Sequence, residues 1–574
     1  MKKIFVNIIV LMSIFCMTSC VQDLKVESID PNQTSTVDID GLLAKCYSTL
    51  GTTGQQGPAG MGDIAGIDEG TSAFYRMLFS LNEFPSDLVY WIWPDVGVDD
   101  VRCATWNSSN ALVKGLYSRL YFDITLCNLY LDRTVDFVEE GIDAKRAEVR
   151  FLRALNYYYL LDLYGNVPFV VSSEDKSNPK QIMRPDLFNF VEEELITAAK
   201  DLAPAGQRYA YYRVDKAAAW LLLSRLYLNA PVYLTKSDAE CKSYMDKAVL
   251  YSDSVINSSY KLASKFQYLF MGDNDCTSAV NDAYQEIILP IAQDGKHIRS
   301  YGGSTFLIAA THTSEMESWG TTDSWKCIRS RKQLVQLFFP ELKRNYEIES
   351  FSDDAATTDF VEGDFTTYAP YMEQFENLDY VGGKSKMVEF AKDDRALLSN
   401  YEVFNDTAVF ACNFGKQNKG DEFKSGWMIS KFTNLYAGDG KPSDTAWPDM
   451  DIPFMRKAEA YLNYAEAVLR GGEAKSMTAD AAVNELRNRA NAAPLAGVTL
   501  DDILDERGRE FFCEGYRRSD LVRFNKFGGN TGYNWEWKGG AQLGKAFDEY
   551  RNLYPIPKSD IITNSENLTQ NEGY

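Results

Sequence analysis

Histidine is nearly absent from this chain of 574 residues, which contains only His297 and His312. A His-rich metal site or several His-based catalytic centres are therefore excluded. A single histidine-dependent triad stays compatible with the composition, but each histidine is better explained as a loop residue. We expect no metal centre and no bound cofactor.

The ten cysteines lack the paired spacing that marks a zinc site or a disulfide framework. No CxxC pair occurs, and eight of the ten are scattered between positions 46 and 513. Cys127 and Cys513 fall on apolar faces of predicted helices, where they are expected to be small core residues. The other two, Cys16 and Cys20, belong to the N-terminal segment.

Long hydrophobic runs are also missing beyond the first twenty residues. Two lysines precede the apolar stretch 4–17, which is too short to span a membrane and is typical of a signal peptide. Small residues then lead into Cys20. We predict a lipoprotein signal over residues 1–19, after which Cys20 carries lipid on its thiol and amine. The alternative is an ordinary secretory signal with an incidental cysteine.

Lipidation would anchor the protein to a membrane that it does not span, because several acyl chains on one residue bind durably. Residues 20–37 are polar and contain a proline, and they predict a flexible lipidated tether. No other segment approaches the length of a transmembrane helix.

Basic residues are scarce relative to acidic ones, 59 against 81, which gives a net charge of −22. Removing residues 1–19 takes away two lysines and no acidic residue, so the mature chain carries −24. Such a surface repels the phosphates of nucleic acids and of anionic lipids. We expect no nucleic-acid partner, and membrane attachment is left to the acyl chains.

No linker rich in glycine, serine or proline interrupts the middle of the chain, so we expect a single domain over residues 38–574. Helical periodicity dominates residues 38–256 and returns over 452–530. Between them, residues 260–450 contain aromatics, glycines and short apolar runs. Long irregular segments are usually functional or disordered, and the aromatic content argues against disorder. We predict that this loop-rich, irregular insert is the ligand-binding region.

Residues 146–168 (RAEVRFLRALNYYYLLDLYGNVP) predict a helix with a defined end. Apolar residues recur at helical spacing between Phe151 and Leu163 and form one broad face. Gly165 suits the left-handed position after a helix, and Pro168 cannot extend the helix. Three consecutive tyrosines at 157–159 put aromatic bulk on three sides, which indicates a helix packed between neighbours.

Further helices of fifteen to twenty residues follow one another with short connections, which favours antiparallel pairs. Alanines lie where such helices would cross closely, for example at Ala147, Ala154 and Ala218. The predicted fold is therefore mainly α, a tetratricopeptide-like superhelix of helical pairs in which each pair buries its face against its neighbours.

Four segments together resemble the SusD/RagB family, the surface glycan-binding lipoproteins of Bacteroidetes. They are the helix at 146–168, MRKAEAYLNYAEA at 455–467, DERGREFFCEGYRRSDLVRF at 505–524 and the tail that runs from YPIP at 554 to NLTQNEGY at its end. The segments occur in the order that the family shows, and the resemblance covers the whole mature chain.

This resemblance implies a non-catalytic lipoprotein of the outer membrane that faces the cell exterior and captures oligosaccharide or polysaccharide. It also implies a partner, a SusC-like TonB-dependent transporter to which the glycan is delivered. Two alternatives stay open. One is a RagB-like relative that captures peptides, and the other is a surface glycoside hydrolase, which would need two carboxylates at a set separation.

A sugar can be held by an aromatic ring against its C–H face and by polar side chains at its hydroxyl groups. Tryptophans, a tyrosine and polar residues that could do so lie in two polar, loop-like stretches and in the glycine-rich loop 54–70. The candidate glycan-binding residues are Trp91, Trp93, Trp106, Asn107, Asp63, Tyr301, Trp319 and Trp325. The structural alternative for each tryptophan is that its ring plugs the helical scaffold, as we expect for Trp427, Trp447, Trp535 and Trp537.

A dense set of opposite charges lies near the C-terminal end of the predicted helices. It comprises Arg507, Arg509, Arg517 and Arg518 with Glu506, Glu510, Glu514 and Asp520. An anionic ligand site is one interpretation. An ion-pair network that joins helices is the favoured one.

Overall fold

The computed structural model describes most of the chain from Asp38 onward, namely residues 38–339, 386–399 and 427–574 apart from 59, 315, 317, 536, 542 and 543. The predicted signal peptide, the tether with Cys20, and residues 340–385 and 400–426 of the predicted insert lie outside the described residues.

Helices account for most of the regular structure in these ranges. They are α2 (Ile39–Ser48), α3 (Phe74–Glu83), α4 (Val98–Arg102), α5 (Ala111–Arg133), α6 (Ile142–Leu163), α7 (Arg184–Asp201), α8 (Lys216–Leu228), α9 (Ala230–Tyr233), α10 (Lys242–Ile256), α11 (Ser304–Thr311), α12 (Lys332–Phe338), α14 (Lys386–Ala391), α15 (Lys457–Leu469), α16 (Ala479–Arg489), α17 (Leu500–Phe511), α18 (Arg517–Arg523) and α19 (Lys558–Thr563). Short 3₁₀ helices are η1 (Gly70–Ser72), η2 (Phe266–Phe270), η3 (Ala283–Gln285), η7 (Lys538–Gly540) and η8 (Glu549–Asn552).

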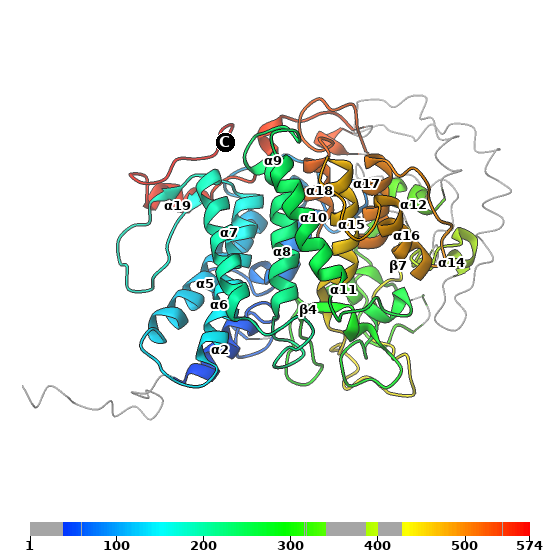
Figure 1. The fold of residues 1–574 in the computed structure, drawn as a ribbon, viewed down its shortest axis with the longest axis horizontal. Helices are drawn as coiled ribbons and strands as arrows, with labels where there is room; N and C mark the ends of the chain where they lie inside the picture. The colour runs from blue at the N-terminus through cyan, green and yellow to red at the C-terminus, as the bar shows by residue number, and fades with distance from the viewer. Residues whose placement is uncertain are drawn as a thin grey trace, which may run out of the picture.

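The long helices pack side by side in the order of the chain (Figure 1). Helix α5 packs on α6, α6 on α7, α7 on α8, and α8 on α10. Helix α10 then packs on α15, although some 200 residues of sequence separate the two. The predicted mainly helical fold of packed helix pairs is confirmed. The segment between α10 and α15 leaves the helical stack and returns to it.

Helix α6 shows why this stack is so tightly ordered. Its three consecutive tyrosines are 0%, 2% and 6% exposed, as expected for a helix enclosed by neighbours. Each hydroxyl still finds a partner, and that of Tyr157 donates to the Val170 carbonyl at 2.6 Å. The helix ends as predicted, because Gly165 adopts a φ of +74° and its N–H donates to the Leu160 carbonyl at 3.0 Å.

Short antiparallel strand pairs fasten the irregular segments to the helices. The strands are β1 (Val89–Trp91), β2 (Val167–Pro168), β3 (Gln181–Ile182), β4 (Ile287–Ile291), β5 (Ile328–Ser330), β6 (Leu398–Ser399), β7 (Met428–Ile429) and β8 (Ile452–Arg456). They pair as β1 with β5, β2 with β3, β4 with β8, and β6 with β7. The β4–β8 pair joins an early part of the segment between α10 and α15 to its end, because β4 follows η3 and β8 leads directly into α15.

The interleaved charges around α17 and α18 form a buried ion-pair network, which confirms the favoured interpretation. Arg507 pairs with Asp520 at 2.8 Å, and Arg517 pairs with Asp87 at 2.7 Å. Burial alone would raise the pKa of Glu506, but the surrounding arginines, Arg395 first among them, lower it to about 2. These charges join helices to each other.

Within the described ranges, no helix has the length and apolar character needed to cross a membrane.

Candidate functional site

Strands β1 and β5 bring the two predicted aromatic loop regions together. Trp91 lies opposite Ile328 in this pair, and the N–H of Ile92 donates to the Cys327 carbonyl at 2.9 Å. The segment that follows Trp91 and the segment that precedes Ile328 therefore meet at this strand pair, although more than 200 residues of sequence separate them. The two stretches that hold most of the candidate tryptophans therefore meet at this strand pair.

Trp91 itself is part of the core. Its ring is 2% exposed and stacks on Phe306 of α11, with ring centroids 5.8 Å apart. Trp93 follows two residues later and packs edge-on against it at 6.0 Å, half-buried. The two rings share a side, as the spacing predicts, but that side faces inward. Trp91 is therefore packed in the core, where it also lines a cavity beside Arg76, whereas Trp93 is not among the residues that line that cavity.

Trp106 is also enclosed, so it presents no ring face to a ligand. It is 1% exposed, its indole N–H donates to the Tyr574 hydroxyl at 2.6 Å, and its ring lies 4.7 Å from that of Tyr554. The C-terminal residues, which pattern reasoning did not connect with this loop, complete its surroundings. Asn107 is exposed, but its carboxamide oxygen accepts from the Ser109 N–H at 2.8 Å and so forms a local turn.

Asp63 fixes the glycine-rich loop and does not reach into the site. Arg119 of α5 binds both of its carboxylate oxygens, at 2.6 and 3.1 Å, and Lys45 lies 3.7 Å away. The bidentate guanidinium pair uses one acceptor position on each carboxylate oxygen and fixes the carboxylate against α5. The predicted hydroxyl-binding role of Asp63 therefore gives way to a structural one.

Trp319 lies in the second aromatic loop but turns into the protein. It is 6% exposed, stacks on His312 with centroids 5.0 Å apart, and donates its indole N–H to the Asp323 carbonyl. Burial lowers the pKa of His312 to about 4, so this histidine is neutral at physiological pH. This pair supports the loop from beneath.

Three partly buried aromatic rings form a cluster, which we call the aromatic platform: Tyr301, Trp325 and Trp447. The Tyr301 ring centroid lies 6.1 Å from that of Trp325 and 5.1 Å from that of Trp447. Two of these residues were predicted, and Trp447 was not. Its setting, KPSDTAWPDM, is as polar as that of Trp325, so the same criterion applied there would have found it.

Backbone hydrogen bonds hold the platform in place. The N–H of Trp325 donates to the Ala309 carbonyl at 2.6 Å. The Trp447 N–H and its neighbour's donate to the Asp444 carboxylate at 3.2 and 2.8 Å, and these bonds lower the pKa of Asp444. Arg299 also pairs with Asp444 at 3.0 Å. The rings are thus pre-oriented on loops that the scaffold fixes.

Arg76 of α3 connects the platform to a cavity. Its guanidinium lies 5.9 Å from the Trp325 ring centroid, and its Nη1 donates to the Tyr301 carbonyl at 3.5 Å. The same side chain lines a cavity of about 390 Å³, whose polar lining also includes Asp68, Thr71 and Asp95. Neither Asp68 nor Asp95 is buried. The site therefore combines flat rings with hydrogen-bonding groups of both kinds.

The charge of Arg76 is not neutralised by a contact. It forms no salt bridge with any of the described residues, and burial lowers the pKa of its guanidinium. Most of its five N–H donors are thus available to a ligand. Asp68 accepts from Thr71, which fixes one acceptor at the rim of the cavity.

Two family models match the chain. The model described as "SusD family" matches residues 286–574, and the one described as "Starch-binding associating with outer membrane" matches residues 27–228. The starch-binding protein SusD of Bacteroides thetaiotaomicron is 41% identical over 97% of this chain and 96% of its own length. The chain belongs to the SusD family.

More distant relatives share the whole length. The SusD-like protein P2 of Formosa agariphila is 23% identical over 100% of both chains. Among solved structures, surface glycan-binding protein A from Bacteroides fluxus superposes with a TM-score of 0.63 at 19% identity, over 93% of this chain and 99% of its own. Surface glycan-binding protein A from Bacteroides thetaiotaomicron, in complex with laminarihexaose, gives 0.62 at 17% identity, over 93% and 98%. These structures establish the fold.

Proposed function

We propose that this protein is a non-catalytic glycan-binding protein whose ligand lies across the aromatic platform, with Arg76, Asp68 and Asp95 binding its hydroxyl groups. The observation that carries the proposal is the contiguity of three half-exposed rings with an unpaired guanidinium at a cavity. A titrating acid, base or nucleophile is not needed for such binding.

The chemistry of a neutral oligosaccharide fits this arrangement. Successive rings 5.1 and 6.1 Å apart can each cover one C–H face of neighbouring sugar units. A guanidinium donates to hydroxyl oxygens, whereas a carboxylate accepts from hydroxyl protons. An extended peptide would instead need a groove with free backbone partners, so the paired rings favour sugar.

The relative at 41% identity is named for starch binding, and we therefore propose α-linked glucose oligomers as the ligand to test first. Titration calorimetry with the full chain should show saturable binding of maltoheptaose. Laminarihexaose, a β-linked glucose oligomer of similar size, serves as the comparison. If neither oligosaccharide binds, nor any member of a broader glycan array, the proposal is wrong.

The platform is tested by Trp325→Ala. This substitution should raise the dissociation constant by roughly 10- to 100-fold, because truncating a central aromatic contact typically costs about 2 kcal/mol or more. The buried Trp427 offers the matched control. Trp427→Phe keeps an aromatic core residue and should leave affinity unchanged, since its ring is fully enclosed.

Two competing activities have direct assays. Release of reducing sugar from a panel of polysaccharides, at a rate comparable with a glycoside hydrolase, would contradict the non-catalytic role. Binding of oligopeptides without any response to glycans would favour the peptide-capturing alternative.

We further propose that the protein is anchored to the outer membrane through lipid on Cys20, faces the cell exterior, and delivers its glycan to a SusC-like TonB-dependent transporter. The family description that mentions the outer membrane supports the location. Palmitate labelling should be lost in Cys20→Ser, while labelling that persists would contradict the anchor. Cross-linking in whole cells should yield a TonB-dependent transporter, and its absence from the products would contradict the partnership.

A further inference from the structure

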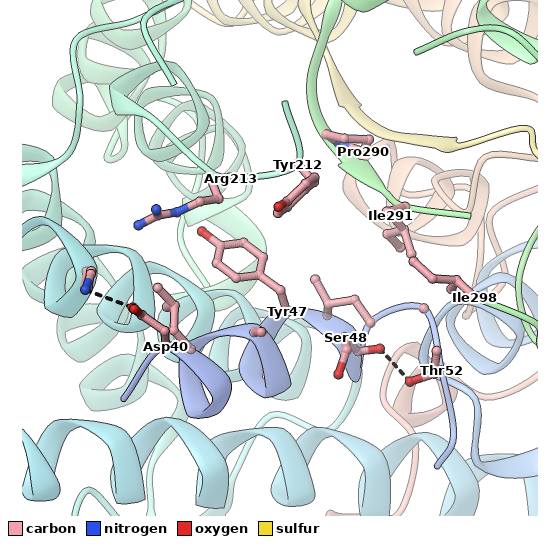
Figure 2. Close-up of a pocket in the computed structure, with 15 residues that line it drawn as sticks. Asp40, Tyr47, Ser48, Thr52, Tyr212, Arg213, Pro290, Ile291 and Ile298 are labelled. Atoms are coloured by element: carbon pink, nitrogen blue, oxygen red, sulfur yellow. Dashed lines mark hydrogen bonds and ion pairs between the residues drawn. The ribbon is translucent and has the colours of Figure 1, made fainter. Parts of the chain in front are cut away.

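A second and larger cavity lies apart from the aromatic platform, between α2, the loop before α8 and the segment after β4 (Figure 2). Its volume is about 560 Å³, within the range of small-molecule sites. In Figure 2, Tyr47 and Arg213 approach from one side, and Pro290, Ile291 and Ile298 stand on the other. The proposed glycan function makes no use of this space.

The walls of this cavity are predominantly apolar. Helix α2 contributes Leu43 and Ala44, and the segment after β4 contributes Ala292 and Ile298. A ligand that buries an apolar body against these side chains gains roughly 25 cal/mol for each Å² removed from water. A sugar, with hydroxyl groups around its ring, would leave many of them unpaired here.

The charged groups at the mouth are already paired with one another. Lys145 of α6 bridges Asp40 at 2.8 Å and Glu139 at 3.0 Å. Arg213 binds both carboxylate oxygens of Glu148 through its Nε and Nη2. A charged ligand would have to compete with these pairs, so the cavity favours a neutral one.

Two donors remain for a ligand. The Nη1 of Arg213 and the hydroxyl of Tyr212 make no hydrogen bond to any described residue. Both residues line the cavity, and Tyr212 is 52% exposed. By contrast the Tyr47 hydroxyl is occupied, because it donates to Glu148 at 2.7 Å. The cavity therefore presents two hydrogen-bond donors, and a ligand that fits it needs a hydrogen-bond acceptor.

We propose that this cavity binds a neutral, largely apolar molecule with a hydrogen-bond acceptor, namely an ester of an aryl or alkyl acid. The acyl or aryl body fills the apolar interior, and the ester carbonyl accepts from Arg213 and Tyr212. Such esters exist as free molecules and as substituents of polysaccharides. The chemistry is shared, and the experiment separates the two sources.

The cavity adjoins the glycan site through one short segment. Ile298 lines the cavity, and Tyr301 of the platform follows three residues later. Glu69 ties this segment to the loop after α2, since Ser300 and Thr53 both donate to its carboxylate, at 3.3 and 2.6 Å. A glycan on the platform therefore has a nearby place for an esterified branch.

The test uses the full chain with methyl cinnamate and ethyl butyrate as neutral esters and cinnamate as the charged counterpart of the first. Ligand-observed nuclear magnetic resonance should detect at least one ester, with cinnamate bound at least about tenfold more weakly. If neither ester binds, or if cinnamate binds as well as its ester, the proposal is overturned.

Ala44→Phe places a ring in the mouth of the cavity from an exposed position on α2. It should weaken ester binding by at least about tenfold, because the added ring occupies the ligand's space. Ala481→Phe is the matched control, an exposed alanine on α16 that does not line the cavity, and it should change affinity by less than about twofold. Equal ester binding in wild type and Ala44→Phe would overturn the proposal.

Whether the ester is part of a glycan or a free molecule is tested by comparing the binding of an acylated oligosaccharide with that of the same oligosaccharide after alkaline de-esterification. For a glycan-borne ester, the acylated form should bind more tightly, and Ala44→Phe should abolish that advantage. For a free ester, both oligosaccharides should bind alike while the small esters still bind. If no oligosaccharide binds but the small esters do, the glycan-binding proposal fails and the cavity proposal stands.

Discussion

Two arginine environments in this protein, one fully buried and one half-buried, differ in what surrounds the charge. Arg456 of β8 is fully buried and binds carboxylates on every side, at 2.6 Å from Glu510, 2.8 Å from Glu514 and 3.1 Å from Glu286. Arg76 of α3 has aromatic rings around it and no salt bridge among the described residues.

The difference teaches how to separate a structural charge from a functional one. A cation that carboxylates satisfy completely fixes the position of neighbouring helices and has nothing left to offer a ligand. A cation at a cavity that keeps unused donors has been desolvated in part without compensation, which a ligand can supply. The arginine-rich sequence at 505–524 belongs to the first kind, and its density misleads if it is taken for a binding site.

The largest expected effect comes from breaking the paired environment. Arg456→Met should lower the free energy of unfolding by about 3–5 kcal/mol, because three buried carboxylates, Glu286, Glu510 and Glu514, each lose one of their cationic partners. Urea denaturation measures this. Lys242→Met removes an exposed pair with Asp246 and should cost at most about 0.5 kcal/mol. Similar losses of stability in the two variants would contradict the distinction between the buried and the exposed ion pairs.

An intermediate case is Asp123 of α5, which is buried 4.0 Å from Arg119 while that arginine is committed to Asp63. Burial raises the pKa of Asp123 to about 7. The folded state therefore holds a proton that the unfolded state releases, and stability falls as pH rises from about 4 to 7.

Asp123→Asn should remove this part of the pH dependence. Relative to wild type, the variant should gain on the order of 2–4 kcal/mol between pH 5 and pH 8. Denaturation at both pH values measures the gain, with the exposed Asp136→Asn as the control for loss of one surface carboxylate. Parallel curves for wild type and Asp123→Asn would contradict the assignment.

Arg76→Met tests the unpaired environment itself. Glycan affinity should fall by roughly 10- to 30-fold, since hydrogen bonds from a charged donor are worth about 1.5–2 kcal/mol. Stability should stay the same or rise, because no carboxylate loses its partner. Calorimetry and urea denaturation on one preparation give both quantities. A large loss of stability with unchanged glycan affinity would show that Arg76, like Arg456, has a structural role and does not bind the ligand.

The smallest effect is expected at Trp106, whose ring is buried and whose indole N–H already has a hydrogen-bond partner. Trp106→Phe should cost about 1–2 kcal/mol of stability through the lost hydrogen bond to Tyr574 and the lost volume. Glycan affinity should change less than about twofold. Weaker glycan binding without a loss of stability would indicate that Trp106 contacts the ligand.

The helical scaffold could be predicted because its information is local. The periodicity of α6, its glycine stop and its tyrosines each follow from spacing and from the backbone preferences of single residues. The pairing of β1 with β5 could not be predicted in this way, since three-residue strands more than 200 positions apart leave no periodic signal. The pairing of β4 with β8 could not be predicted either, because these five-residue strands also lie far apart in the sequence.

For the candidate site, composition and loop context indicated stretches rich in aromatic residues but not the orientation of each ring. Trp91 and Trp325 both lie in stretches that were predicted to be loops, yet Trp91 faces the core and Trp325 is only partly buried. The orientation of Trp91 depends on its stacking against Phe306 and on the register of the strand pair, which are features of the tertiary structure. Arg76 was missed because its proposed role rests on its forming no salt bridge with the described residues, although Asp68 and Asp95 line the same cavity, and only a structure reveals this.

The short β1–β5 ladder has a consequence for how recognition can change over time or in the laboratory. Because three residue pairs hold the roots of both aromatic loops, the segments beyond them can be exchanged or lengthened while the helices stay as they are. New carbohydrate preferences are therefore accessible by swapping loops on a constant frame, provided that Val89–Trp91 and Ile328–Ser330 are left intact.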